Sequence, residues 1–286
     1  MDSEAICARH IRRLEPIATG VAPRLNDQHS CAAMLFDVYG TLLISGAGEI
    51  GLGEQVDRAT TNRLLDLCQR YNIQRTPQEL MSALENTVNA NHHNRRQRGV
   101  AFPEIDIVQI WQTVLGWNDV DRVKAFALET ELIVNPVYPM PGMNELLAFC
   151  RNRGLRMGII SNAQFYTIVV LEWLFGGTIA SQGFDPQLLF FSWQAGHAKP
   201  SRFMFARAKE ALDADGIAAE AVLYVGNDMR NDILPAASIG FKTALFAGDR
   251  RSLRHAGDEQ SSQFCPDLVV TELNQLIGVL RLQGVE

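Results

Sequence analysis

The chain has 286 residues, of which 47% are hydrophobic and 20% charged, with a formal net charge of −6. This composition is typical of a globular protein with enough apolar residues for one large domain or two smaller ones. The mild acidity, and the absence of a long run of Lys or Arg, argue against the basic surface that nucleic-acid binding requires, so we expect no nucleic-acid partner.

The five cysteines are scattered and form none of the close pairs that mark zinc sites or redox motifs. Such cysteines are typical of a protein in a reducing compartment. The N-terminus carries charges with no apolar segment after them, and no stretch has the roughly 18 to 20 apolar residues that span a bilayer. We therefore expect a cytoplasmic protein with no membrane partner.

The first segment of regular structure is predicted after residue 30. Residues 1–30 include Pro16 and Pro23 and lack sustained periodicity, so we interpret them as an extension lying on the main domain. Residues 31–37 form a short apolar run that ends in Asp37 and leads into a tight turn. This pattern predicts a buried strand that opens the main domain.

Apolar residues recur at helical spacing between residues 51 and 136, which predicts a helical insertion. After it, strand-like apolar runs alternate with amphipathic helical stretches down to the C-terminus. The predicted strands are 156–161, 188–192, 221–226, 242–246 and 268–270, and the predicted helices are 143–153, 165–175, 202–212, 232–238 and 272–282.

This alternation predicts an α/β fold with a Rossmann-like, three-layer core, in which helices cover both faces of a parallel sheet. The core would comprise residues 31–50 and 137–286, with an all-helical domain inserted at 51–136. Ligands of such sheets bind outside the carboxyl ends of the strands, with right-handed crossovers between them. The polar residues at or just beyond predicted strand ends are Asp37, Ser161, Asn162, Lys199, Asn227 and Asp228.

Asp37 is the predicted nucleophile, because a carboxylate at a strand tip can split a difficult displacement into formation and hydrolysis of a covalent intermediate. Lys199, in a loop before Pro200, is a cation suited to neutralising that carboxylate and a charged group in transfer. The alternatives are that Asp37 only accepts backbone N–H groups in its turn and that Lys199 is a solvated surface residue.

Hydroxyl and backbone donors near Asp37 are candidates for holding the transferring group. Thr41 or Ser161 can donate a hydroxyl hydrogen bond, and backbone N–H groups around Gly40 can form an anion-binding nest. We predict that Gly40, Ser161 and Asn162 bind substrate. Taken alone, Ser161 is also compatible with an ordinary capping role at a strand end.

Asp228 and Asp232 are close enough in sequence to share a site with Asn227. Such an oxygen-rich cluster facing Asp37 suits Mg²⁺. Asp232 is equally compatible with capping the helix that follows it.

Four motifs therefore lie at the strand ends, and together they resemble those of the haloacid dehalogenase superfamily in order and position. They are Asp37-Val38-Tyr39-Gly40-Thr41, Ile160-Ser161-Asn162, Lys199-Pro200, and Gly226-Asn227-Asp228 with Asp232. The resemblance extends from about residue 32 to the end, and the helical insertion resembles that superfamily's cap. Residues 141–147 are also similar to the phosphoglycolate-phosphatase-like branch.

The resemblance implies that Asp37 is the nucleophile and that Asp37, Asp228 and the backbone carbonyl of Tyr39 hold Mg²⁺. It implies that Asp232 acts through water or through Lys199.

Tyr39 stands where phosphatases of the superfamily usually carry a second Asp, which protonates the leaving alcohol and then activates water. Dehalogenases of the superfamily resemble the chain at this position, because a departing halide needs no proton. The retained acids Asp228 and Asp232 favour phosphorus instead, since a divalent ion stabilises a phosphate far more than a carbon–halogen bond. Phe205 also departs from the dehalogenases, which place a Tyr there.

The helical insertion carries a basic run that includes Arg95 and Arg98. These arginines are candidate substrate ligands on a lid, although a charge run of this kind is more typical of a solvated helix end. The apolar stripe within residues 105–115 is predicted to be core of the insertion rather than substrate pocket.

The sequence thus predicts a Mg²⁺-dependent phosphatase of a small, anionic metabolite that works through an aspartyl phosphate on Asp37. Tyr39 keeps open a metal-independent 2-haloacid dehalogenase. It also keeps open a catalytically retired member that binds a ligand or partner.

Overall fold

A six-stranded parallel sheet lies at the centre of the computed structural model, which describes residues 1–25, 29–47, 57–255 and 265–281. The strand order is β6-β5-β2-β7-β8-β9. These strands are β2 (Ala33–Phe36), β5 (Arg156–Ser161), β6 (Phe184–Phe191), β7 (Val222–Gly226), β8 (Lys242–Phe246) and β9 (Leu268–Val270). The predicted α/β class and parallel sheet are confirmed.

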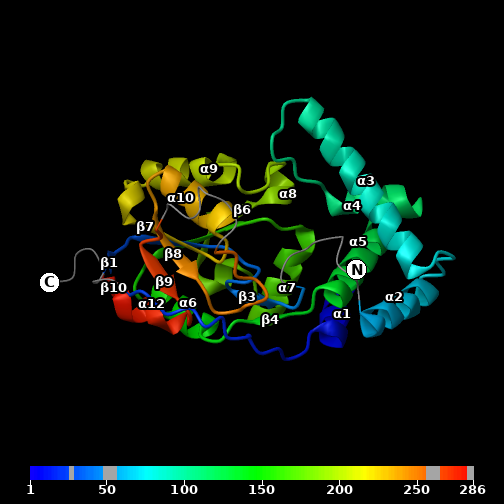
Figure 1. The fold of residues 1–286 in the computed structure, drawn as a ribbon, viewed down its shortest axis with the longest axis horizontal. Helices are drawn as coiled ribbons and strands as arrows, with labels where there is room; N and C mark the ends of the chain where they lie inside the picture. Colours follow the sequence, from blue (N-terminus) through cyan, green and yellow to red (C-terminus); the bar gives the residue numbers. More distant parts are fainter. Residues whose placement is uncertain (26–28, 48–56, 256–264, 282–286) are drawn as a thin grey trace.

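Helices cover both faces of the sheet (Figure 1). One side carries α6 (Met143–Asn152), α7 (Phe165–Phe175) and α12 (Asn274–Val279), and the other carries α9 (Phe203–Ala214) and α10 (Leu234–Ser238). Because side chains alternate across a strand, Met34 and Phe36 enter the first core cluster, whereas Ala33 and Leu35 enter the second. Burial on both faces explains why β2 is a continuous apolar run.

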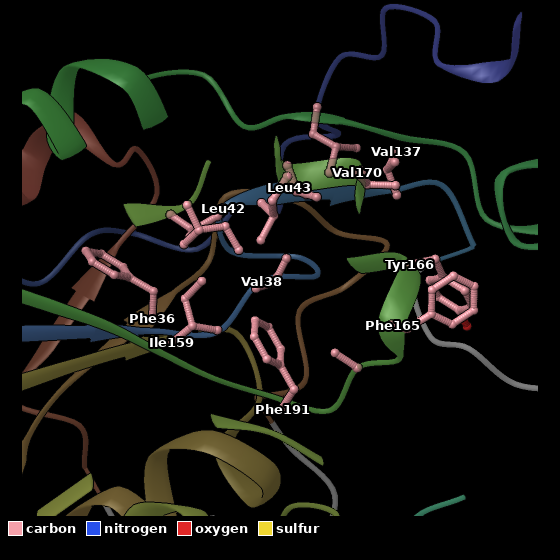
Figure 2. Close-up of a cluster of buried hydrophobic side chains, with 14 of the residues drawn as sticks. Phe36, Val38, Leu42, Leu43, Val137, Ile159, Phe165, Tyr166, Val170 and Phe191 are labelled. Atoms are coloured by element: carbon pink, nitrogen blue, oxygen red, sulfur yellow. The ribbon is translucent and has the colours of Figure 1, made fainter. Parts of the chain in front are cut away.

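The first cluster reaches the turn that follows β2. Figure 2 shows Phe36 and Ile159, from adjacent strands, gathered with Val38 and Leu42 of that turn. All four side chains are fully buried. The turn that carries the candidate nucleophile is therefore held against the core by its own apolar residues.

A helical insertion separates two short strands that pair antiparallel, β3 (Leu43–Ser45) and β4 (Val137–Pro139). Its helices are α2 (Arg58–Arg70), α3 (Pro77–Gln97), α4 (Ile107–Leu115) and α5 (Val120–Val134), which group to one side of the sheet (Figure 1). Each begins after an Asp or Thr whose side chain accepts an N–H of the first turn, and Thr76 forms a capping box with Glu79. The insertion is confirmed, but its predicted start at residue 51 lies outside the described residues.

Three predicted elements differ from the structure by more than two residues at one end. β6 begins at Phe184 rather than 188, because an edge strand tolerates Pro186 and polar residues that hide it from pattern analysis. The predicted helix 232–238 begins earlier, as a π-helix, η3 (Met229–Ile233), which runs into α10. The predicted helix 272–282 is shorter, and residue 282 lies outside the described residues.

Smaller elements complete the chain. They are α1 (Ser3–His10), α8 (Ser192–Ala195), η1 (Ala180–Gln182), η2 (Ala219–Ala221), and the parallel pair β1 (His29–Ser30) and β10 (Leu280–Arg281). All five cysteines are free, and only Cys265 is exposed. Among the described residues, no helix is both long and apolar enough to cross a membrane.

The N-terminal extension touches both the core and the insertion, so the prediction that it lies on the main domain was incomplete. Thr19 Oγ1 donates to the Ala247 carbonyl at 2.7 Å, and Arg24 pairs with Val269 of β9. Before this stretch, α1 packs on α5 of the insertion and on α7 of the core. The extension therefore links the two parts of the chain.

Glu129 of α5 holds α1 and α2 in place. Its buried carboxylate accepts from Arg70 at 2.7 Å, Tyr71 at 2.9 Å and Arg9 at 3.2 Å, and lies 3.0 Å from His10 Nε2. Burial alone would raise the pKa of Glu129, but the hydrogen bonds from His10, Arg70 and Tyr71 outweigh it and lower the pKa to about 2.

A folded-state pKa below the unfolded value means that Glu129 stabilises the fold above about pH 4.5, and that this stability is lost as the pH falls toward 2. We expect Glu129→Gln to lower the free energy of unfolding by about 2 kcal/mol at pH 7, because the variant loses the charge that its cationic partners bind. The loss is no larger because two of these partners, Arg9 and Arg70, are half-exposed and screened by solvent. Urea denaturation at pH 7 and pH 3 measures this, with exposed Glu145→Gln as control. An equal loss at both pH values would show that the charge is not responsible.

Candidate active site

Asp37 directly follows β2, and its N–H continues the sheet by donating to the Val225 carbonyl at 2.9 Å. The chain then turns tightly, with Leu43 N–H donating to the Val38 carbonyl at 2.9 Å and Gly40 N–H to the Leu43 carbonyl at 2.7 Å. Gly40 has a φ of 81°, a conformation that favours glycine. This turn fixes the carboxylate at the end of the sheet.

Lys199 joins Asp37 to Asp232. Its Nζ lies 2.7 Å from Asp37 Oδ1 and 2.5 Å from Asp232 Oδ1, and its side chain is 4% exposed. Burial would lower the pKa of Lys199, but the two carboxylates outweigh burial and raise it. Burial raises the pKa of Asp37 to about 6, against the opposing effect of Lys199. The ammonium is therefore the fixed charge of the site.

Asn162 positions the backbone of Lys199. Its Oδ1 accepts from the Lys199 N–H at 2.7 Å, and its Nδ2 donates to the Lys199 carbonyl at 3.3 Å. Asn162, predicted to bind substrate, thus has its side-chain amide bound to the backbone of Lys199. It also lines the cavity described below.

Asp232 is almost completely buried and organises the fourth motif. Its Oδ2 accepts from the N–H groups of Asn227 at 3.1 Å and Asp228 at 3.0 Å, and its Oδ1 accepts from Tyr224 at 3.0 Å as well as from Lys199. These N–H groups precede Asp232, so it does not cap the helix that follows. Both of its oxygens are engaged within the protein, one of them with Lys199, through which the resemblance implied that Asp232 acts.

Thr41 and Asn227 are also engaged within the protein. Thr41 Oγ1 donates to Asn227 Oδ1 at 3.0 Å, and Asn227 Nδ2 donates to the Ser252 carbonyl at 2.7 Å. The pair ties the first motif to the fourth. Predicted roles for Thr41 as a donor to substrate and for Asn227 as a metal ligand do not match these contacts.

Ser161 differs from Thr41 because its hydroxyl is uncommitted. The side chain is fully buried at the end of β5, and its Oγ has no hydrogen-bond partner among the described residues. The hydroxyl lies near enough to Asp37 to lower the pKa of that carboxyl. Ser161 can therefore donate to Asp37 or to a group bound at Asp37.

Tyr39 does not offer an acid or base at neutral pH. Its hydroxyl lies 2.9 Å from Thr167 Oγ1 on α7. Burial raises the pKa of Tyr39 far above its ordinary value, and the charges of Glu131 and Asp37 add to this. The phenol stays protonated and is held by α7.

Three of the remaining oxygen donors are of the kind that Mg²⁺ uses. Asp37, Asp228 and the Tyr39 carbonyl supply hard oxygen ligands, and Mg²⁺ commonly uses one or two carboxylates and keeps several waters. Burial, and after it the charge of Asp232, raise the pKa of Asp228 against the opposing charge of Lys199. Both oxygens of Asp228 accept hydrogen bonds, Oδ1 from the backbone N–H groups of Arg230 and Asn231 and Oδ2 from the Asn231 side chain. The described ranges contain no group of three His, Cys, Asp or Glu side chains that could by itself hold a metal ion.

A cavity of about 410 Å³ lies between the strand ends and the helical insertion. The core contributes Asp37, Lys199 and Asp228, together with Tyr39 from the first turn. The insertion contributes a mainly apolar wall made of Met81, Leu84, Val88, Ile105, Ile107, Trp111, Ala127 and Val134. The size suits a small organic ligand.

The cavity bears on two predictions about the insertion. Neither Arg95 nor Arg98 lines it: Arg95 donates to the carbonyls of Glu104 and Gly196, and Arg98 is exposed. Ile105 and Trp111 of the apolar stripe are buried in the core, as predicted, and they also line the cavity.

Sequence reasoning missed Tyr224, whose hydroxyl is 3.4 Å from Lys199 Nζ, and Glu131, which lines the cavity. Tyr224 is the one polar-ended side chain inside the predicted strand 221–226, and that position was the available signal. Nothing in the sequence pattern of α5 separates Glu131, which lines the cavity, from Asp121, which is exposed.

A family model for haloacid dehalogenase-like hydrolases matches residues 31–240. The chain belongs to this family and is a hydrolase. No curated protein matches the chain.

Solved structures share the fold of this haloacid dehalogenase-like hydrolase. A 2-haloacid dehalogenase from Pseudomonas syringae pv. Tomato DC3000 is 18% identical with a TM-score of 0.57, covering 87% of this chain and 97% of that chain. A HAD phosphatase from Thermococcus onnurineus is 16% identical with a TM-score of 0.54, covering 87% and 99%. A HAD hydrolase from Bacillus subtilis bound to magnesium is 16% identical with a TM-score of 0.50, covering 87% and 98%. At these identities the likeness shows the fold alone.

Gly40 offers a test of the turn geometry in this hydrolase. A Cβ there would lie 2.4 Å from Ser252 Cβ and 2.8 Å from Asn227 Nδ2, whereas a Cβ at Gly216, with a φ of 75°, meets nothing within 4 Å. We expect Gly40→Ala to lose about 1–3 kcal/mol more unfolding free energy than Gly216→Ala, because only the first adds a clash to the backbone cost. Chemical denaturation compares them, and equal losses would contradict the close packing of the turn.

Proposed function

We propose that this hydrolase is a Mg²⁺-dependent phosphatase of a small phosphorylated metabolite in the cytoplasm. The observation that carries the proposal is the charge at the strand ends, where Asp37 and Asp232 contact the ammonium of Lys199 and Asp228 lies within its electrostatic range. A phosphate dianion would be repelled by this excess of carboxylates, and a divalent ion would offset it. The magnesium bound to the fold relative from Bacillus subtilis supports the same choice of ion.

Asp37 would attack phosphorus, which forms an aspartyl phosphate and releases the alcohol or acid; water would then hydrolyse this intermediate. Lys199 holds the attacking carboxylate in one orientation and offsets charge on the transferring group. Ser161 supplies an uncommitted hydroxyl to a phosphoryl oxygen. Mg²⁺ held by Asp37, Asp228 and the Tyr39 carbonyl would neutralise charge on the phosphate.

Tyr39 restricts the leaving group. A phenol with a raised pKa, already bound to Thr167, is not poised to give up a proton, so a poor leaving group such as an alkoxide loses general acid catalysis. A good leaving group, such as a phenolate or a carboxylate, needs little such help. The proposal therefore favours aryl or acyl phosphates over alkyl phosphates.

The second candidate is a metal-independent 2-haloacid dehalogenase, which Tyr39 favours because a halide leaves without a proton. The charges of the cavity weigh against it. Five carboxylates line the described cavity, against Lys199 and Arg254 as its Lys and Arg side chains, so the carboxylate of a haloacid meets a surplus of like charge. A catalytically retired protein is the third candidate, and it predicts no turnover of any substrate.

Metal removal and loss of the nucleophile separate these candidates. We expect hydrolysis of p-nitrophenyl phosphate to require Mg²⁺, to stop with EDTA, and to fall at least about 10³-fold in Asp37→Asn. Exposed Asp213→Asn is the matched control and should keep wild-type rates. Phosphate release that ignores EDTA would contradict the proposal, as would metal-independent halide release from chloroacetate or 2-chloropropionate.

The missing general acid is tested by restoring it. We expect Tyr39→Asp to raise turnover of alkyl phosphates by about 10²- to 10⁴-fold and that of p-nitrophenyl phosphate much less, because only the alkoxide needs the proton. Tyr39→Phe removes the hydroxyl alone and should leave the ratio of aryl to alkyl turnover as in wild type. Steady-state rates on both substrates measure this, and a uniform gain on both would argue against a missing acid.

A further inference from the structure

Two glutamates of α5 lie two residues apart and have opposite surroundings. Residues two apart on a helix do not share a face, so Glu129 and Glu131 point to different neighbours. Glu129 has two arginines and a histidine around it. Glu131 lines the cavity and has no ion pair among the described residues; it accepts from Asn135 Nδ2 at 3.2 Å and from Tyr166.

Glu131 and one other carboxylate face the cavity from the insertion; neither has an ion pair among the described residues, but they differ in their hydrogen bonds. Glu104, the other one, accepts from Ser192 Oγ at 2.6 Å, from the Ile105 N–H at 2.8 Å and from Gln164 at 3.2 Å, and the charge of Arg95 acts on it. Its hydrogen-bonding capacity is used within the protein. Burial raises the pKa of Glu131, as expected for a carboxyl without a counter-charge.

Thr130 provides an independent second observation. It precedes Glu131, lines the same cavity, and is 4% exposed. Its Oγ1 has no hydrogen-bond partner among the described residues. A buried hydroxyl without a partner is costly unless a ligand or water completes it. Two adjacent residues thus offer oxygen acceptors to the cavity.

The acceptors lie on the insertion side, away from the reacting carboxylate. Asp37, Tyr39 and Glu131 line the same cavity, so one small molecule can meet both the nucleophile and Glu131. The insertion wall of this cavity is mainly apolar, with Trp111, Ile107 and Val134 among its residues. A ligand with a charged phosphate, an apolar body and a cationic end matches these surfaces.

We propose that the substrate is a phosphate monoester whose leaving group is a compact apolar body ending in an ammonium group, and that Glu131 and Thr130 bind this ammonium. The inference rests on the proposed phosphatase activity for its phosphate end. An ammonium donates to oxygen acceptors and supplies the charge that Glu131 lacks. A carboxylate in its place would be repelled.

Three aryl phosphates that differ only at the far end test the proposal: 4-(2-aminoethyl)phenyl, 4-propylphenyl and 4-(2-carboxyethyl)phenyl phosphate. We expect kcat/KM with Mg²⁺ to be at least about 10-fold higher for the ammonium ester than for its propyl isostere, the range of a hydrogen bond to a charged group. The carboxylate ester should be the poorest. Equal values for the ammonium and propyl esters would overturn the proposal.

Variants locate the preference. Glu131→Gln should reduce the ammonium-to-propyl ratio to near one, and Thr130→Val should reduce it about 2- to 10-fold. Exposed Glu145→Gln should keep the wild-type ratio. A ratio unchanged in Glu131→Gln would overturn the assignment, and because the readout is a ratio, a general loss of activity does not imitate it.

Calorimetric binding of the same three esters to Asp37→Asn separates this inference from the proposed function. Tighter binding of the ammonium ester, lost in the double variant with Glu131→Gln, supports the subsite even if no ester is turned over. Turnover of the propyl ester without any ammonium preference in rate or binding leaves the phosphatase standing and rejects the subsite.

Discussion

The buried ammonium of Lys199 is the interaction on which the site depends. It sits between carboxylates from two different strand ends, Asp37 after β2 and Asp232 beyond β7, and is itself carried by the loop after β6. An isolated charge buried at this depth would be strongly unfavourable, and so would either carboxylate without its partner. The three loops must therefore adopt their positions together.

This arrangement also explains why several polar side chains near the nucleophile are not available for chemistry. Asp232 holds the backbone of the fourth motif, and Asn227 and Thr41 bind one another across it. These three side chains hold the first and fourth motifs together, and with them Asp37 and Asp228. Fewer side chains are available to contact a substrate than are needed to form the site.

The core of the fold could be predicted because its signals are local. Strands such as β5 and β8 are continuous apolar runs between helical patterns, and both match their predicted bounds. The convergence of Asp37, Asn162 and Lys199 followed from the rule that parallel strands present their carboxyl ends at one edge. β3 and β4 were missed, because each is three residues long and they pair across the whole insertion.

The cavity could not be predicted, because it depends on how the insertion packs against the core. The sequence pointed to Arg95 as a substrate ligand, since a basic run is visible, but its guanidinium is used on the carbonyls of Glu104 and Gly196. Glu131 gave no signal, because helical periodicity does not tell a face that meets solvent from one that meets an enclosed cavity. Tyr39 stood out by its position, yet its partner Thr167 lies 128 residues away in sequence.

The two faces of α5 should leave different traces in evolution. Position 129 is bound to α1 and α2, so its substitutions should covary with those at His10 and Arg70, whatever molecule the protein acts on. The residue at position 131 faces the cavity, so we expect its type to change among relatives that act on different substrates. One helix would then carry a position constrained by the fold on one face and a position constrained by the substrate on the other.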